Sequence, residues 1–200
     1  MDYFPVFLDL RGRRALVVGA GAAADAKAAA LARAGADVHL TQSFAPTMLD
    51  DAALVFVAGA RLALAEQVAR AAEARGIWVN VMDEPRLCSF LMPALVERGP
   101  VTVAIGTSGT APMLARLLRE WLDLALPLRL GALASLAGRF RPLVRRRLPD
   151  LPTRRRFWHR IFTGKVAQRA LDGDEAAARA ALLAALDETQ AAATDHDKAA

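Results

Sequence analysis

Residues 14–24 read Arg-Ala-Leu-Val-Val-Gly-Ala-Gly-Ala-Ala-Ala. The short apolar run before the first glycine is typical of a strand buried on both faces of a parallel sheet. An alanine-rich stretch at 22–34 predicts the helix that follows it, and residues 35–41 supply a helix stop and a second strand. The first 41 residues therefore predict a unit of two parallel strands joined by a helix.

Further strands and helices are expected along the first half of the chain. Runs rich in β-branched residues at 54–58, 77–81 and 101–105 predict three more strands, and 62–75 has helical spacing. Five strands interleaved with helices predict an α/β fold with a doubly wound parallel sheet. After residue 109 the strands do not recur, which places a domain boundary near residue 110.

The second half of the chain is predicted to be helical. Residues 112–125 read as one long amphipathic helix, and glycines and prolines between 127 and 152 divide the following stretch into shorter helical pieces. The turn at 172–175 is expected to cap a helix near 176–186. Residues 191–200 are expected to form a flexible tail.

Composition excludes several classes of protein. The 200 residues are enough for one domain, or one with a small appendage, and 54% of them are hydrophobic. The one cysteine, Cys88, excludes an internal disulfide and suits a reducing compartment. The N-terminus lacks the basic and apolar regions of a secretory signal, and charges and proline interrupt the leucine-rich run at 121–138. We therefore expect a cytoplasmic protein without a membrane span.

The glycine loop predicts nucleotide binding. Gly19 permits the tight turn after the first strand, and Gly21 lets the backbone approach a pyrophosphate, held with the backbone of Ala22 and Ala23 at the helix N-terminus. The adenosine side is expected at the end of the second strand, where the chain has Gln42, Ser43 and Phe44. That strand end carries no carboxylate for the ribose, so NAD and NADP both remain open. The alternative is a domain of this fold that has lost its cofactor.

Motifs from residue 4 to residue 158 resemble one enzyme family. They are Phe4-Pro-Val-Phe-Leu-Asp-Leu-Arg-Gly-Arg, the glycine loop with Lys27, Gly35-Ala-Asp-Val, Asn80-Val-Met-Asp-Glu-Pro, Ser89-Phe-Leu-Met-Pro-Ala, Val103-Ala-Ile-Gly-Thr-Ser-Gly-Thr-Ala-Pro, Leu114-Ala-Arg-Leu-Leu-Arg-Glu and Arg154-Arg-Arg-Phe-Trp. In this order they are similar to the precorrin-2 dehydrogenase and sirohydrochlorin ferrochelatase module at the N-terminus of siroheme synthases.

The resemblance implies an activity and a domain arrangement. It implies NAD-dependent oxidation of precorrin-2, an octacarboxylate tetrapyrrole, to sirohydrochlorin, followed in some members by insertion of ferrous iron. It also implies a homodimer whose active site lies between the nucleotide domain and the partner. The expected division is a Rossmann-like NAD-binding domain at 1–110, a dimerisation region at 111–148, a helical C-terminal domain at 149–190 and the tail.

The resemblance also assigns site residues. Asp83 matches the carboxylate implicated in both reactions, and as a general base it would accept a proton at the end of the 77–81 strand. Its alternative role is a turn former before Pro85. Substrate contacts are expected at Asn80, Thr107, Ser108 and Arg116, with the hydroxyl that is phosphorylated in some members falling at Thr107 or its neighbour.

Some family features are missing from this chain. Only residues 42–53 connect the second strand to the next, where the family carries a further strand and helix. The family's Thr-Asp-Asp beside the nicotinamide corresponds to Gly59-Ala60-Arg61, its later asparagine to Ala65, and the arginine before the matching lysine to Ala26. The alternative function is therefore a tetrapyrrole or nucleotide sensor of the same fold that no longer turns over.

The positive charge of the chain is local. The net charge is +5, but residues 129–160 hold ten arginines against one acid. This segment could be a solvated face or dimer contact, could bind substrate carboxylates, or could contact nucleic acid, which the absence of any nucleic-acid motif disfavours. The three histidines have no ligand spacing, so no resident metal is expected.

Overall fold

The computed structural model describes residues 2–198, and the side chains of residues 2–192. The chain divides into two compact units. Unit 1 runs to Pro93 and takes in Gly106–Pro112, and unit 2 holds Ala94–Ile105 and the chain from Met113 onward. The predicted boundary near residue 110 is therefore wrong for residues 94–105, which pack with the helical part.

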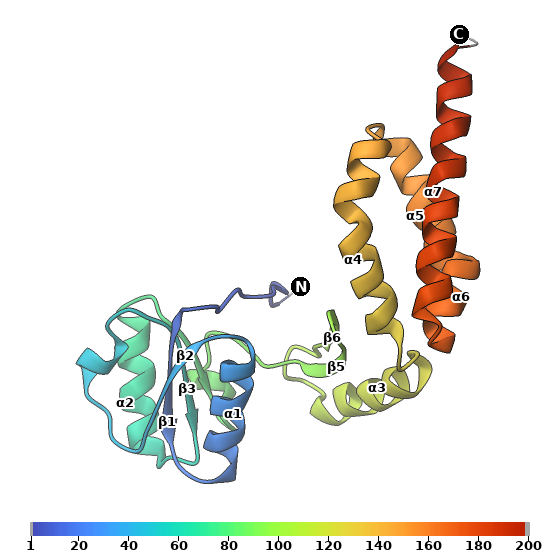
Figure 1. Cartoon of the computed structure of the whole chain (residues 1–200). Helices are drawn as coiled ribbons and strands as arrows, with labels where there is room; N and C mark the ends of the chain where they lie inside the picture. Colours follow the sequence, from blue (N-terminus) through green and yellow to red (C-terminus); the bar gives the residue numbers. More distant parts are fainter. Residues whose placement is uncertain (1, 199–200) are drawn as a thin grey trace. The chain divides into compact units, whose positions relative to one another are not determined.

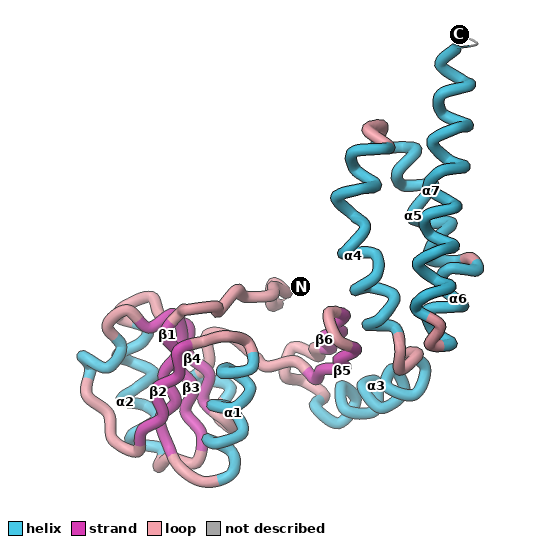
Figure 2. Tube along the Cα trace, viewed as in Figure 1, coloured by secondary structure: helices cyan, strands magenta, loops and turns pink. Residues whose placement is uncertain are grey.

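Unit 1 is a four-stranded parallel sheet with helices on both faces (Figures 1 and 2). The strand order is β2-β1-β3-β4. Its elements are β1 (Arg14–Gly19), α1 (Ala22–Arg33), β2 (Asp37–Thr41), the 3-10 turn η1 (Pro46–Leu49), β3 (Ala52–Ala58), α2 (Leu62–Glu73), β4 (Trp78–Val81) and the 3-10 turn η2 (Pro85–Leu87). The predicted Rossmann-like sheet is confirmed with four strands.

The apolar run of β1 explains why helices cover both faces of this sheet. Successive side chains of a strand point to opposite faces. Leu16 and Val18 pack into one core cluster with Val68 of α2, whereas Val17 packs into the other with Leu31 of α1. Because both clusters are closed to water, β1 can hold no polar residue between Ala15 and Val18.

The fifth predicted strand does not join this sheet. Residues 101–105 form β6 (Val101–Ile105), which pairs antiparallel with β5 (Ala94–Arg98) in a separate hairpin of unit 2. Burial alternates along β6, as in a strand with one covered face, instead of running unbroken as in β1. The hairpin abuts α4, because a Cβ on Gly131 would overlap the backbone of Arg98.

The rest of unit 2 is helical: α3 (Pro112–Ala125), α4 (Leu130–Arg147), α5 (Leu151–Thr163), α6 (Lys165–Asp172) and α7 (Glu175–Lys198). Helices α4 to α7 enclose one apolar core that includes Phe157, Ile161 and Leu182. Phe157 lies in this core, whereas Phe162 is exposed and stacks on Trp158 at 5.6 Å between ring centroids.

Two further parts of the helical half differ in structure from the regions drawn from the sequence. Helix α4 is continuous through Gly138 and Pro142, where a break was expected. An internal proline costs about 3 kcal/mol, but the buried face of α4, which includes Leu136 and Val144, offsets that cost. Helix α7 continues to Lys198, so residues 191–198, expected to belong to a flexible tail, are helical. Residues 199 and 200 of the predicted tail lie outside the described residues.

Candidate active site

The strand order of unit 1 creates one place suited to a ligand. From β1 the chain crosses to β2 on one side, and β3 then lies on the other side of β1. In open parallel sheets ligands bind beyond the carboxyl ends of the strands, where the strand order reverses. In unit 1 that position is occupied by the loop after β1, residues 19–21, beside the loop after β3.

Two glycines allow these loops to approach each other. Gly19 has φ +138°, and a Cβ on it would overlap the carbonyl oxygen of Ala58. Gly59 has φ +66°, and a Cβ on it would overlap the carbonyl oxygen of Ala20. The predicted need for glycine at position 19 therefore has a structural cause, while the need at Gly59 was missed. A glycine directly after a buried strand was the available signal.

Gly21 is different, because the space around it is open. Its φ and ψ are +81° and −178°, and no atom outside its immediate neighbours lies within 4 Å of a Cβ built on it. It precedes α1, whose first N–H groups, those of Ala22 and Ala23 included, have no acceptor within the helix. Ala24 is fully buried, which brings α1 against the sheet. This geometry fits the pyrophosphate of a dinucleotide, since the free N–H groups of α1 and the backbone of Gly21, which has no side chain, face the same open space.

The expected adenosine side lies at the same edge of the sheet, after β2. Ser43 bends back on the strand, donating its N–H to Thr41 Oγ at 3.2 Å. Gln42 and Ser43 are exposed, and Phe44 is half-buried against the core cluster of α2. The chain to β3 holds only η1, so the short connection seen in the sequence is confirmed. Gln42 and Ser43 are therefore free to meet a ligand, and Phe44 is available only in part.

Asp83 lies in a tight turn directly after β4. Met82 still donates its N–H to the carbonyl of Val57 in β3 at 2.9 Å, and the N–H of Glu84 then reaches the carbonyl of Val81 at 3.3 Å. Asp83 is the third residue of this turn and has φ +63°, a value that few residues other than glycine adopt. Its carboxylate is exposed. The turn thus presents Asp83 at the carboxyl ends of the strands, where the glycine loop also lies. It is two strand spacings, or roughly 10 Å, from β1.

Asn80, an expected substrate contact, is buried and already hydrogen-bonded within unit 1. Its side chain is 8% exposed and donates from Nδ2 to the carbonyl of Phe90 at 2.9 Å. A buried amide that already has a backbone partner is poorly placed to bind a substrate. Asn80 instead ties β4 to the segment that returns after η2, a role that no residue spacing in the sequence indicates.

The remaining predicted substrate residues fall in both units. Thr107 and Thr110 close a turn of unit 1 with an N–H to carbonyl bond of 2.9 Å, and Ser108 at its tip has φ +52° and is exposed. Arg116 belongs to α3 of unit 2, where its Nε pairs with Glu120 at 3.1 Å. The hydroxyl of Ser108 is therefore open to solvent, while the guanidinium of Arg116 already has an acidic partner.

Part of the arginine segment serves the helical core. Arg147 pairs with Asp187 at 2.5 Å, Arg160 with Glu188 at 3.6 Å and Arg139 with Glu175 at 3.8 Å. Each pair joins α4 or α5 to α7, a role that was not anticipated. The deep burial of Phe157 removes one of the rings that a nucleic acid could have stacked on.

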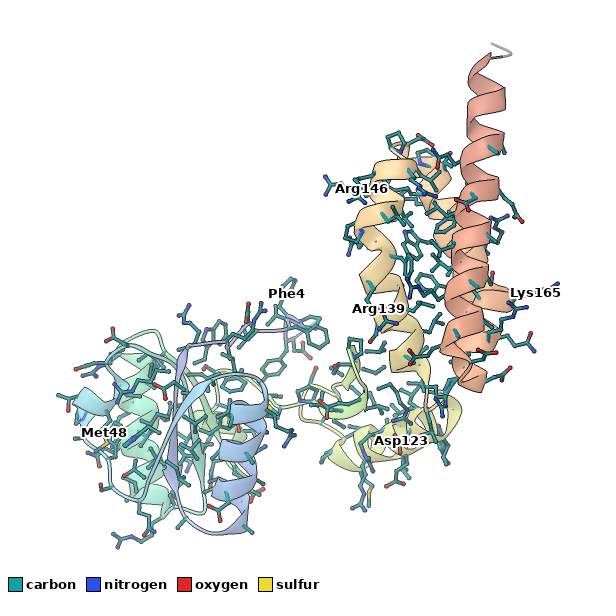
Figure 3. All side chains as sticks on the ribbon, viewed as in Figure 1. Phe4, Met48, Asp123, Arg139, Arg146 and Lys165 are labelled. Atoms are coloured by element: carbon teal, nitrogen blue, oxygen red, sulfur yellow. The ribbon has the colours of Figure 1, made fainter. Side chains whose placement is uncertain are left out.

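Other arginines of the segment lie on a face of α4 that is free of such pairs among the described residues. Arg141, Arg145 and Arg146 line a shallow surface groove with Gly138 and Pro142. Figure 3 labels Arg139 and Arg146 at different levels of this helix. The groove concentrates positive charge. It is consistent both with binding of substrate carboxylates and with a face that is simply solvated.

Metal clusters and membrane spans are both missing from the part of the chain that the structure describes. No group of three or more histidine, cysteine, aspartate or glutamate residues is arranged there to hold a metal ion. Within that same part no single helix has the length and apolar character needed to cross a membrane, although α3 and α4, which meet at 73°, satisfy that test as a bent pair.

Two family descriptions match the chain in separate regions. Residues 6–94 match the family described as "Putative NAD(P)-binding". Residues 129–186 match the family described as "Sirohaem synthase dimerisation region". The first region holds the glycine loop and Asp83, and the second holds α4 to α6 and the first half of α7.

Curated relatives match over most of the chain. A siroheme synthase of Pseudomonas aeruginosa is 43% identical over 199 residues, which cover 89% of this chain and 43% of the relative. A siroheme synthase of Zymomonas mobilis is 40% identical over 195 residues, covering 87% of this chain and 41% of the relative. The chain therefore spans less than half the length of these relatives.

A solved structure of SirC, a precorrin-2 dehydrogenase, has a similar fold. The TM-score is 0.66 at 19% sequence identity, and the match covers 93% of this chain and all of that one. The resemblance stated from the sequence motifs is thus confirmed by relatives, by both family descriptions and by fold.

Proposed function

The chain is homologous to siroheme synthases along most of its length, and on that premise we propose that it oxidises precorrin-2 to sirohydrochlorin with NAD as the hydride acceptor. The observation that carries the proposal is the pairing of an open glycine loop with an exposed carboxylate at one edge of the sheet. Gly21 belongs to the open loop and Asp83 supplies the carboxylate, and both lie within the region that matches the NAD(P)-binding family.

Different residues of unit 1 bind the cofactor and accept the proton in this reaction. The backbone at Gly21, Ala22 and Ala23 binds the pyrophosphate, and Gln42, Ser43 and Phe44 line the adenosine side. NAD supplies a ring carbon that accepts a hydride from the macrocycle. Asp83 accepts the proton released from a neighbouring position, so that precorrin-2 and NAD give sirohydrochlorin, NADH and one proton.

The direct test is the formation of NADH. The whole chain is mixed with precorrin-2 and NAD, and the NADH absorbance is followed together with the spectrum of the tetrapyrrole. Asp83→Asn keeps the size of the side chain and suits a positive φ, but it cannot accept a proton. We expect it to bind NAD as wild type does and to lose turnover by about a hundredfold or more. An Asp83→Asn variant with wild-type turnover would remove Asp83 as the base.

A second candidate is a binding protein that does not turn over. It is favoured by the loop after β3, where Gly59-Ala60-Arg61 replaces the acidic side chains that the family resemblance leads one to expect. In this case NAD and the tetrapyrrole would bind to wild type without NADH formation. The same assay, combined with calorimetric titration of each ligand, separates the two candidates.

Iron insertion would use the same carboxylate. Ferrous iron is then a substrate, and Asp83 would accept protons from the pyrrole nitrogens of sirohydrochlorin. We expect the Asp83→Asn variant to lose insertion and oxidation together, which can be followed from the change in the tetrapyrrole spectrum on adding ferrous iron without oxygen. Loss of one activity alone would give the two reactions different bases.

We also propose that the protein is a homodimer in the cytoplasm. Support for the dimer comes from the match to the dimerisation region and from α3, whose residues Leu114, Leu117, Trp121 and Leu124 are exposed at helical spacing. An exposed apolar stripe of this length is typical of an association surface. Support for the compartment is the free thiol of Cys88.

A further inference from the structure

Strand β4 lies at the edge of the sheet, and side chains from the following loop complete its hydrogen bonding. Ser89 Oγ accepts the N–H of Val79 at 2.7 Å, and Cys88 Sγ accepts the N–H of Val81 at 3.1 Å. The N–H of Ser89 in turn donates to the carbonyl of Val79 at 2.8 Å. The segment after η2 therefore returns along β4 and takes the place of a neighbouring strand.

The thiol of Cys88 lies at the centre of the turn that carries Asp83. Besides the N–H of Val81, its Sγ lies 3.2 Å from the carbonyl oxygen of Val81 and 3.4 Å from that of Glu84. These groups belong to the two ends of the turn. One thiol, which can accept and donate at once, thus joins both ends of the turn on either side of Asp83.

Asn80 supports this arrangement from the buried side. Its Nδ2 lies 3.7 Å from Cys88 Sγ and donates to the carbonyl of Phe90. The ring of Phe90 packs edge-on against Phe56 of β3 at 5.2 Å between centroids. The loop is therefore fixed at Phe90, two residues after Cys88, by a hydrogen bond and by an aromatic contact.

Asp83 needs such support because its backbone is strained. Holding a non-glycine residue at positive φ costs about 1–2 kcal/mol, which the surrounding contacts must supply. Burial raises the pKa of the Cys88 thiol, so that at neutral pH the sulfur keeps the proton with which it donates. An alanine at position 88 would remove both functions of the thiol and would leave the N–H of Val81 without its acceptor.

We propose that Cys88 and Asn80 are positioning residues for the reaction, which hold the turn so that Asp83 meets the substrate in one orientation. The inference rests on the proposed function of Asp83. Neither residue touches the substrate in this proposal, because both act through the turn. Misplacing a catalytic group by about 1 Å can lower the rate a hundredfold.

The experiment compares Cys88→Ala with Cys88→Ser in the whole chain. We expect Cys88→Ala to lower kcat about ten- to a hundredfold and to leave the Kd for NAD unchanged, because the glycine loop is untouched. Serine keeps a group that accepts and donates, so Cys88→Ser should recover most of the lost kcat. Asn80→Ala should resemble Cys88→Ala.

A control separates positioning from loss of stability. Leu31→Ala removes a buried side chain of α1 from a core cluster to which Cys88 does not belong, and it should lower the unfolding midpoint without lowering kcat at temperatures where the variant is folded. Amide hydrogen exchange adds a readout that does not need turnover, since the N–H of Val81 should exchange faster in Cys88→Ala than in wild type.

The outcomes distinguish the two proposals. If wild type turns over and Cys88→Ala matches it in kcat and in exchange at Val81, the positioning role is refuted while the dehydrogenase remains. If wild type does not oxidise precorrin-2, the proposed function fails and the positioning role fails with it, whatever the exchange rates are. Positioning would also be refuted if Cys88→Ser lost as much kcat as Cys88→Ala and Leu31→Ala showed the same loss.

Discussion

Replacing Gly21 by alanine tests the glycine loop most directly, because the surroundings of this residue separate strain from ligand binding. No protein atom obstructs a new Cβ, so the folded state suffers only from backbone strain. The φ and ψ of +81° and −178° lie in a region used almost only by glycine, which costs about 1–3 kcal/mol for alanine. The same Cβ would stand where the pyrophosphate approaches the helix N-terminus.

The expected loss of affinity follows from the hydrogen bonds that the Cβ displaces. A bond from a backbone N–H to a charged oxygen contributes about 1.5–3 kcal/mol. Losing one should therefore weaken NAD binding by roughly ten- to a hundredfold. Unfolding in urea followed by circular dichroism measures the strain, and calorimetric titration with NAD and with NADP measures the affinity.

A matched substitution is offered by Gly12. It also has a positive φ, +66°, and a Cβ at this position would meet no other atom within 4 Å, but the residue lies in the turn before β1, away from the site. Gly12→Ala should lower stability by about 1–2 kcal/mol and leave NAD affinity unchanged. Equal NAD affinity in wild type and Gly21→Ala would refute the assignment of the loop, and so would an equal loss of affinity in both variants.

Three further predictions concern other parts of the chain. Gly131→Ala should destabilise unit 2 by about 1–3 kcal/mol, measured by thermal unfolding, because its Cβ would overlap the carbonyl of Arg98 in the hairpin; an unchanged midpoint would contradict this contact. Trp121→Glu should convert the proposed dimer into monomers in light scattering, since it places a charge in the apolar stripe of α3, whereas a dimer that persists would place the association surface elsewhere. Burial raises the pKa of Cys88 above its ordinary value of 9.0, so the unfolded thiol ionises first and stability should fall as the pH rises above about 9; Cys88→Ala should lack this decline, and a decline of the same size in that variant would exclude the thiol as its cause.

The elements of unit 1 were predictable wherever one local pattern decided the structure. The apolar run before Gly19 identified β1, and the glycine after it placed α1 correctly. Residues 101–105 were assigned to the wrong sheet because their β-branched content resembles that of β1. The alternation of large apolar residues with Thr102 and Ala104 was the better guide. It matches the alternating burial of β6, in which these two residues are exposed on one face of the hairpin.

The helical half shows where local signals fail. Pro142 predicts a break in a helix, but the contacts that keep α4 continuous come from α5, α6 and α7, which local sequence cannot reveal. The same holds for the acids of α7 that pair with Arg147 and Arg160, because these pairs join residues far apart in the chain.

The candidate site was predictable only in part. The site residues Gly19, Gly21 and Asp83 lie at or just beyond the carboxyl ends of strands. In a parallel sheet these ends all lie on the same side, so the grouping of the three residues follows from the topology. The roles of Asn80 and Cys88 depend on a loop that folds back along an edge strand. No spacing rule in the sequence predicts which loop side chain will accept a strand N–H.

The return of residues 88 and 89 along β4 also affects how this protein behaves in a crowded solution. An edge strand with free N–H groups is a template for a strand of another molecule, and natural sheets avoid this by covering or interrupting the edge. Here the N–H groups of Val79 and Val81 are already occupied by Ser89 and Cys88. The loop that holds Asp83 therefore also protects this edge of the sheet against aggregation.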